Sequence, residues 1–166
     1  MVGSLTILTN RIGGRLDFTA EKIHSLSDDT VKLLNNLDVN KPIFIQAYIS
    51  PEVPRSYLQT RNNIINLLRS FDAQGGDLVH SRIVMTEEYT SEAREARERY
   101  NISSRDIPPW EQTAGNASAI FMGIAFSSGA EEFVIPFFDP GLPVEYELTR
   151  SVRVIARSER KKVGIL

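Results

Sequence analysis

The sequence predicts one α/β domain built on a mixed β-sheet, and two observations support this class. Strand-prone apolar runs alternate with amphipathic helical segments along most of the 166 residues, which implies parallel strands joined by right-handed crossovers. Near the C-terminus, two strand-like runs follow one another across residues 127–130, whose sequence Ser-Ser-Gly-Ala is typical of a hairpin turn. The hairpin adds an antiparallel edge to the sheet, and a final helix follows it.

The run at 43–49 is the predicted centre of the sheet. Its sequence, Ile-Phe-Ile-Gln-Ala-Tyr-Ile, is almost continuously apolar, as expected of a strand that is covered on both faces. The remaining strands are expected at 15–19, 78–85, 119–126 and 132–138.

Start and stop signals delimit the first two helices. Residues 25–28 resemble a capping box, with Ser25 as the N-cap and Asp28 at the third helical position. Pro54 suits the first turn of the second helix, because its missing N–H has no intrahelical acceptor there. Gly75-Gly76 provides the left-handed end of that helix.

A third helix is expected from Thr90 or Ser91 to about Tyr100. It is rich in charge, and pairs such as Glu95 with Arg99 are expected to support it at the periphery of the domain. Pro143 opens the final helix. Basic residues along that helix are interpreted as its solvated side and last turn, where cations complement the helix dipole. They are Arg150, Arg153, Arg157, Arg160, Lys161 and Lys162.

Composition argues against several kinds of chemistry. The formal net charge of -2 provides no broad basic footprint for nucleic acid. The chain has no cysteine, which excludes disulfides, thiol redox chemistry and thiolate metal sites. His24 and His80 each lack a second ligand at metal spacing, and the glycine pairs lack the spacing of a phosphate-binding loop. We therefore expect no metal and no cofactor. No apolar run approaches the roughly 20 residues that span a bilayer.

The order of strands and helices matches the thioredoxin-like fold, a three-layer domain with helices on both faces of its sheet. In that fold a redox-active cysteine pair follows the second strand, at the start of the next helix. The matching segment here is 50–55, which contains no cysteine and therefore no CxxC motif. The resemblance implies a thioredoxin-like scaffold whose usual active site carries no reactive sulfur.

The loop at 105–111 contains the single tryptophan, Trp110, next to two prolines. We expect the indole to fold back onto the core, and the alternative is an exposed aromatic anchor for a partner. Thioredoxin-like folds bring this loop close to the 50–55 turn. The candidate residues for ligand or partner binding are therefore Ser50, Glu52, Arg55, Arg105 and Trp110, and no residue is assigned a catalytic role.

Three segments resemble one protein family. Residues 17–27, Asp-Phe-Thr-Ala-Glu-Lys-Ile-His-Ser-Leu-Ser, resemble the "DLTAEKRYSLS" signature of GldG-like auxiliary proteins of gliding-motility-type ABC transporters. Residues 132–137 and 146–150 are similar to that family's "EEVIPF" and "YELTRAI" stretches, in the same order along the chain. The segment 100–118 is longer and more polar than in the family pattern.

This resemblance implies an extracytoplasmic domain on the periplasmic face of the bacterial inner membrane, anchored by segments outside the present sequence. Residues 1–14 would be a linker or the remnant of a membrane helix, and 15–160 the thioredoxin-like domain. Residues 161–166 would begin the first strand of a following α/β domain. The implied partners are the ABC permease and ATPase subunits, with a peptide or glycan as a further ligand.

The sequence thus predicts a non-catalytic binding module. One alternative is a degenerate thioredoxin-like or carboxylate-dependent enzyme, which would require titratable groups converging in one cleft. Another is a purely structural role, in which the domain spaces or dimerises transporter subunits.

Overall fold

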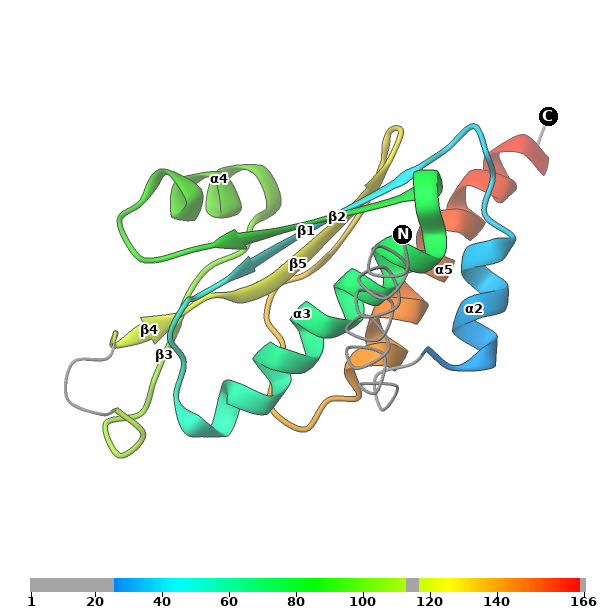
Figure 1. The fold of residues 1–166 in the computed structure, drawn as a ribbon. Coiled ribbons are helices and arrows are strands. Elements are labelled where there is room, and N and C mark those ends of the chain that lie inside the picture. The colour runs from blue at the N-terminus through cyan, green and yellow to red at the C-terminus, as the bar shows by residue number, and fades with distance from the viewer. Residues whose placement is uncertain (1–25, 113–116, 165–166) are drawn as a thin grey trace, which may run out of the picture.

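A four-stranded mixed sheet forms the centre of the molecule in the computed structural model, which describes residues 26–112 and 117–164 (Figure 1). The strand order is β2-β1-β5-β6. These strands are β1 (Ile43–Ile49), β2 (Val79–Met85), β5 (Met122–Ser128) and β6 (Glu131–Ile135). β1 is parallel to β2 and antiparallel to β5, and β5 is antiparallel to β6. The predicted α/β class with a mixed sheet and a C-terminal hairpin is therefore confirmed.

The strand at the predicted centre does lie between two neighbours. In the ladder, Ala47 lies opposite Ile83 of β2 on one side and Ile124 of β5 on the other. The apolar sequence of β1 is explained by burial, since Ile45, Ala47 and Ile49 are fully buried. A second, two-stranded sheet pairs β3 (Arg105–Asp106) with β4 (Ala119–Ile120).

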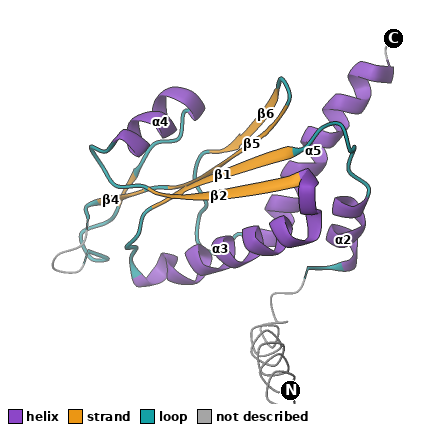
Figure 2. Ribbon diagram, turned by 45° about the horizontal axis from the view of Figure 1, so that its top comes forward, coloured by secondary structure: helices purple, strands orange, loops and turns teal. Residues whose placement is uncertain are grey.

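Helices cover both faces of the larger sheet, which makes three layers (Figure 2). One face is covered by α2 (Asp28–Asn35), α3 (Arg55–Gly75) and α5 (Val144–Gly164), and the other by α4 (Ser91–Tyr100). A short 3-10 turn, η2 (Gly76–Leu78), joins α3 to β2. Among the described residues, no helix combines the length and the apolarity needed to cross a bilayer.

The core is divided between these two faces. The larger cluster lies under α2, α3 and α5 and includes Leu34, Phe71 and Leu148. The smaller cluster lies under α4, whose Ala93, Ala96 and Tyr100 pack against Tyr48 and other sheet residues of that face. α4 is highly charged and yet forms a layer of the domain, because its small alanines let it approach the sheet closely.

Of three predicted helix ends, one differs from the structure. The cap of α2 is Ser27, whose side chain accepts from the backbone N–H of Thr30, so the predicted Ser25–Asp28 box is wrong. Thr90 caps α4, as one of the two predicted positions. Gly76 ends α3 with a φ of 57°, in the left-handed region as predicted.

Two further predictions are wrong. The strand expected at 161–166 does not form over its described part, because α5 continues to Gly164. Glu95 and Arg99 do not pair with each other. Glu95 accepts a hydrogen bond from the Tyr48 hydroxyl, and Arg99 forms a salt bridge with Glu132 at 3.2 Å.

Strand boundaries also shift. The run expected at 119–126 is divided between β4 and β5, and the run at 132–138 ends at Ile135. The expected strand at 15–19 and the linker at 1–14 lie outside the described residues.

Candidate functional site

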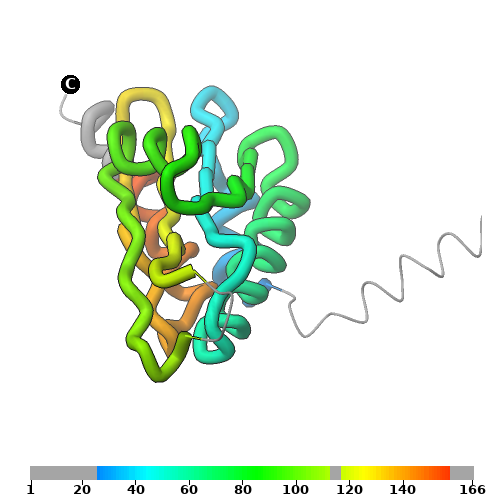
Figure 3. The backbone as a smooth tube through the Cα atoms, turned by 90° about the vertical axis from the view of Figure 1, so that its left-hand side faces the viewer, coloured from blue at the N-terminus to red at the C-terminus, as the bar shows by residue number. Residues whose placement is uncertain are grey.

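The end of the sheet where the parallel strands β1 and β2 finish is the natural place to look for a site. In open α/β sheets, ligands bind outside the carboxyl ends of the strands, at the point where successive connections leave in opposite directions. Here β1 has β2 on one side and β5 on the other. Residues 50–54 follow β1 and residues 86–90 follow β2, and the loop at 107–112 lies beside the start of α3, directly after residues 50–54 (Figure 3). We call this end the carboxyl-edge surface.

Ser50 is buried at this end, with 5% of its surface exposed, and it joins the ends of three strands. Its hydroxyl donates to the carbonyl of Thr86 at 3.0 Å and accepts from the N–H of Phe121 at 2.8 Å. Its own N–H donates to the Phe121 carbonyl at 3.0 Å, and its carbonyl accepts from Nε of Arg61 at 3.1 Å. Since every polar group of Ser50 has a partner within the domain, this residue holds the strands together rather than presenting a hydroxyl to a ligand.

The two other candidates in this turn lie at the surface. Glu52 and Arg55 are exposed, and Arg55 begins α3. The next residue, Ser56, donates from its hydroxyl to Oε2 of Glu111 in the tryptophan loop at 2.5 Å. The structure therefore places the start of α3 beside the loop that carries Trp110.

Trp110 is 82% exposed, so the interpretation that it folds onto the core is wrong. The buried anchor of its loop is Ile107, which is 4% exposed, and its N–H donates to the Ser118 carbonyl at 2.8 Å. Gln112 closes the loop by donating from Nε2 to the Ile107 carbonyl at 2.7 Å. Because Ile107 fills the core position, the indole is presented to solvent on a well-anchored turn.

Arg105 is exposed and held from two sides. Its guanidinium lies 3.9 Å from the centroid of the Phe137 ring and forms a salt bridge with Asp139. Tyr57 packs edge-on against the same Phe137 ring, with 5.9 Å between the centroids. Burial, followed by the nearby charge of Glu111, raises the pKa of the Tyr57 hydroxyl. These contacts give the loop and α3 a shared, ordered surface of aromatic and charged groups.

A second group of candidate residues, in the loop after β2, was not predicted from the sequence. Glu88 accepts hydrogen bonds from Arg97 and Ser104, which tie this loop to α4 and to the segment before β3. Burial raises the pKa of Glu88, but the hydrogen bonds from Ser104 and Arg97 outweigh it and the net pKa is lowered. Tyr89, which is 98% exposed and has a φ of 66°, follows it. The available signal was the Glu87-Glu88 pair, one residue after the strand predicted at 78–85.

The polar groups of the described residues are well satisfied. Among the described residues, every buried side-chain nitrogen and oxygen has a hydrogen-bond partner. In the same part of the chain, no three His, Asp or Glu side chains converge as a metal-ligand set. The carboxyl-edge surface thus combines satisfied polar groups with two large aromatic side chains exposed to solvent.

Comparison with known proteins adds one finding. A family model described as a domain of unknown function (DUF7088) matches residues 20–127, which include every described element from α2 to β4 and all of β5 except its last residue. No curated protein matches the chain.

Proposed function

The chain belongs to the DUF7088 family of domains of unknown function, and we propose that this member is a non-catalytic binding module. It docks a partner protein through the carboxyl-edge surface, as the extracytoplasmic domain of an ABC-transporter accessory protein. The geometry of the carboxyl-edge surface supports the binding role, and the sequence resemblance supports the transporter setting.

The exposure of Trp110 is the observation that carries this proposal. An indole exposed by 82% on an anchored loop forfeits the burial that stabilises most tryptophans. Tryptophan is among the residues that contribute most to binding energy at protein interfaces, because a large rigid ring is desolvated at little entropic cost. A partner that covers Trp110 would recover that burial.

The surroundings of Ser50 support a non-catalytic role. Strand order β2-β1-β5-β6, with helices on both faces, agrees with the thioredoxin-like scaffold that we propose. In such a scaffold, the residues after β1 would provide the reactive group. Here the hydroxyl of Ser50 is buried and committed to Thr86 and Phe121. The carboxylate of Glu88 is likewise engaged, so the geometry offers no support to a degenerate enzyme.

The transporter context has the support of three sequence segments, 17–27, 132–137 and 146–150, which resemble GldG-like auxiliary proteins. In that setting the partners are the ABC permease and ATPase subunits, and a peptide or glycan is a further candidate ligand. The domain would face the periplasm, held at the inner membrane by segments outside this sequence.

Co-purification tests the proposal. The full-length protein that contains this domain is expressed with the permease and ATPase encoded beside it, and the complex is captured from detergent. We expect the wild-type protein to retain both subunits and Trp110→Ala to retain less of them. The matched control is Tyr146→Ala on α5, where an aromatic side chain is 61% exposed away from this surface. Capture of neither subunit by the wild type, or equal capture by both variants, would contradict the proposal.

A further inference from the structure

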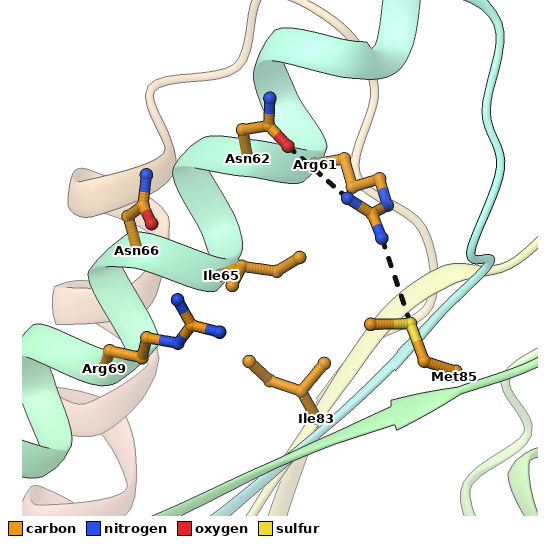
Figure 4. A pocket seen from close by; sticks show the side chains of 7 residues that line it. All are labelled: Arg61, Asn62, Ile65, Asn66, Arg69, Ile83 and Met85. Atoms are coloured by element: carbon orange, nitrogen blue, oxygen red, sulfur yellow. Dashed lines mark hydrogen bonds between the residues drawn. The ribbon is translucent and has the colours of Figure 1, made fainter.

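A groove runs along the outer edge of the sheet, between β2 and α3, and it adjoins the carboxyl-edge surface at Arg61, whose Nε donates to the Ser50 carbonyl. Its volume is about 550 Å³. Ile65, Ile83 and Met85 provide its apolar surface. Its polar residues all belong to α3, and they are Arg61, Asn62, Asn66 and Arg69 (Figure 4).

The backbone of β2 is open on the side of this groove. Thr86 donates its N–H to the Ile49 carbonyl at 2.9 Å, so the even-numbered residues of this segment turn their backbone groups toward β1. The odd-numbered residues therefore point outward, because backbone direction alternates along a strand. Ser81 shows this, since its N–H donates to Oδ1 of Asp72 in α3 at 3.0 Å.

Ile83 and Met85 continue the outward-facing series beyond Ser81. No described residue supplies a hydrogen-bond partner for their outward N–H and C=O groups, because β2 is the last strand on this side of the sheet. An edge with free donors and acceptors is the arrangement onto which an extended peptide adds as a further strand. The side chains of the same two residues line the groove, so backbone and side-chain recognition would occur together.

The charge of the groove selects the occupant. The side chains of Arg61 and Arg69 extend toward β2, and no carboxylate is among the residues that line the hollow (Figure 4). The nearest acid on this face of α3, Asp72, already accepts from Ser81. Guanidinium groups bind carboxylates through paired, charge-assisted hydrogen bonds. We propose that this groove binds an extended acidic segment of a partner protein, which adds to β2 as a fifth strand.

A second copy of the chain fits the groove less well. The β2 sequence, Val-His-Ser-Arg-Ile-Val-Met, contains no carboxylate. Pairing β2 with β2 would bring the Arg61 and Arg69 side chains of both copies to one seam without an acidic partner from either strand.

The spacing of the two arginines specifies the segment further. They are eight positions apart along α3, which is about 12 Å at 1.5 Å per residue. An extended chain covers about 13 Å in four residues, and residues at i, i+2 and i+4 share one face. The fitting segment therefore has acidic residues at i and i+4 and an apolar residue at i+2, above Ile65.

Fluorescence anisotropy with defined peptides tests this inference on the intact domain. The probe is a dye-labelled, end-capped peptide, Thr-Glu-Thr-Val-Thr-Glu-Thr. One control replaces both Glu by Lys, and a second, Thr-Glu-Thr-Val-Glu-Thr-Thr, puts the two acids on opposite faces. We expect the probe to bind at least tenfold more tightly than either control. Equal binding of the probe and the Lys control would overturn the proposal.

Charge reversal in the protein provides the matched pair. Arg69→Glu should weaken probe binding by at least tenfold, since it turns an attraction into a repulsion. Arg94→Glu, an equal change of net charge at an exposed position of α4, should alter it by less than about twofold, because distant surface charges are screened by salt. Equal effects of the two substitutions would overturn the proposal.

Backbone methylation separates strand addition from charge attraction alone. One probe is N-methylated at its Glu and Val residues, and another at its inner Thr residues. In an added strand, alternate residues of the peptide turn their N–H groups toward β2, and the residues between them turn theirs to solvent. One methylated probe should therefore lose binding and the other should keep it. Equal affinity of the two methylated probes would overturn strand addition.

Sedimentation of the wild-type protein tests whether a second copy occupies the groove instead. A dimer that the probe does not dissociate would overturn the proposal and would indicate that the groove binds a second copy of the chain.

Discussion

The hydroxyl of Ser50 accepts a hydrogen bond from the backbone N–H of Phe121 at 2.8 Å, across 71 positions of the sequence. The same hydroxyl donates to the Thr86 carbonyl. One buried side chain therefore completes the hydrogen bonding where β1 and β2 end and β5 begins, at the position where a thioredoxin-like scaffold would have its reactive group.

Removing this hydroxyl should destabilise the domain. Ser50→Ala leaves the buried N–H of Phe121 and the carbonyl of Thr86 with one partner fewer, and we expect the free energy of unfolding to fall by about 1–3 kcal/mol. Urea denaturation followed by circular dichroism measures this. The exposed Ser103 provides the control, and Ser103→Ala should change stability by less than about 0.5 kcal/mol. Equal stability of the two variants would show that the Ser50 bonds contribute nothing.

Trp110 should behave as a solvated indole in the isolated domain. Since it is the single tryptophan and 82% exposed, the fluorescence maximum of the native protein should match that of N-acetyltryptophanamide in the same buffer. Acrylamide should quench both to a similar extent. Trp110→Ala should leave the free energy of unfolding within about 0.5 kcal/mol of wild type. A strongly blue-shifted native spectrum would contradict this arrangement of the loop.

Glu145 should make the domain sensitive to acid. Burial raises the pKa of its carboxyl, but hydrogen bonds from the backbone N–H of Ser27 and the hydroxyls of Ser27 and Thr30 outweigh burial and lower the net pKa. Because the pKa is lower in the folded state, the carboxylate stabilises the fold above the ordinary value of 4.5, and this contribution is lost as the pH falls below it.

The substitution Glu145→Gln isolates this effect. At neutral pH it should lower the free energy of unfolding by about 0.5–1 kcal/mol, since a charge-assisted link between α2 and α5 is weakened. The variant should also lose less stability than wild type on acidification. Glu98→Gln, at an exposed position of α4, serves as the control and should retain the wild-type pH dependence. Parallel acid profiles for wild type and Glu145→Gln would refute the prediction.

Tyr48 should limit stability at alkaline pH. Its fully buried hydroxyl donates to Oε1 of Glu95 at 2.8 Å. Burial, and then this bond to a carboxylate, raise the pKa of the phenol well above its ordinary value of 10.0. The neutral phenol therefore stabilises the fold below pH 10.0, and the contribution decreases as the pH rises above that value because the unfolded chain ionises first.

Tyr48→Phe should reduce this alkaline loss of stability, although the variant loses about 1 kcal/mol at neutral pH with the hydrogen bond. Unfolding by urea at several pH values between about 9 and 11 measures both effects. Tyr146→Phe, where the side chain is 61% exposed, is the control. If the two variants lose stability in parallel as the pH rises, Tyr48 does not carry the effect.

Local patterns identified most of the elements and parts of the candidate site. The apolar run at 43–49 did form the central strand, and Gly76 did end α3, because burial periodicity and left-handed backbone are encoded within a few residues. The same local signals misplaced the cap of α2, where Ser25 and Ser27 both precede acidic residues, and the structure has Ser27 as the cap with its N–H bonded to the distant Glu145.

The sequence by itself determined an α/β domain with a central apolar strand, a C-terminal hairpin and no cysteine chemistry. Only the tertiary structure decided which side chains are exposed and which polar groups meet. Trp110 faces solvent because Ile107 takes the core position. The Ser50 hydroxyl is hydrogen-bonded within the domain because β2 ends and β5 begins beside it. Arg61 and Arg69 face an open strand edge because β2 is the last strand on that side of the sheet. These contacts join residues far apart in the chain, and short-range hydrophobic periodicity contains no information about them.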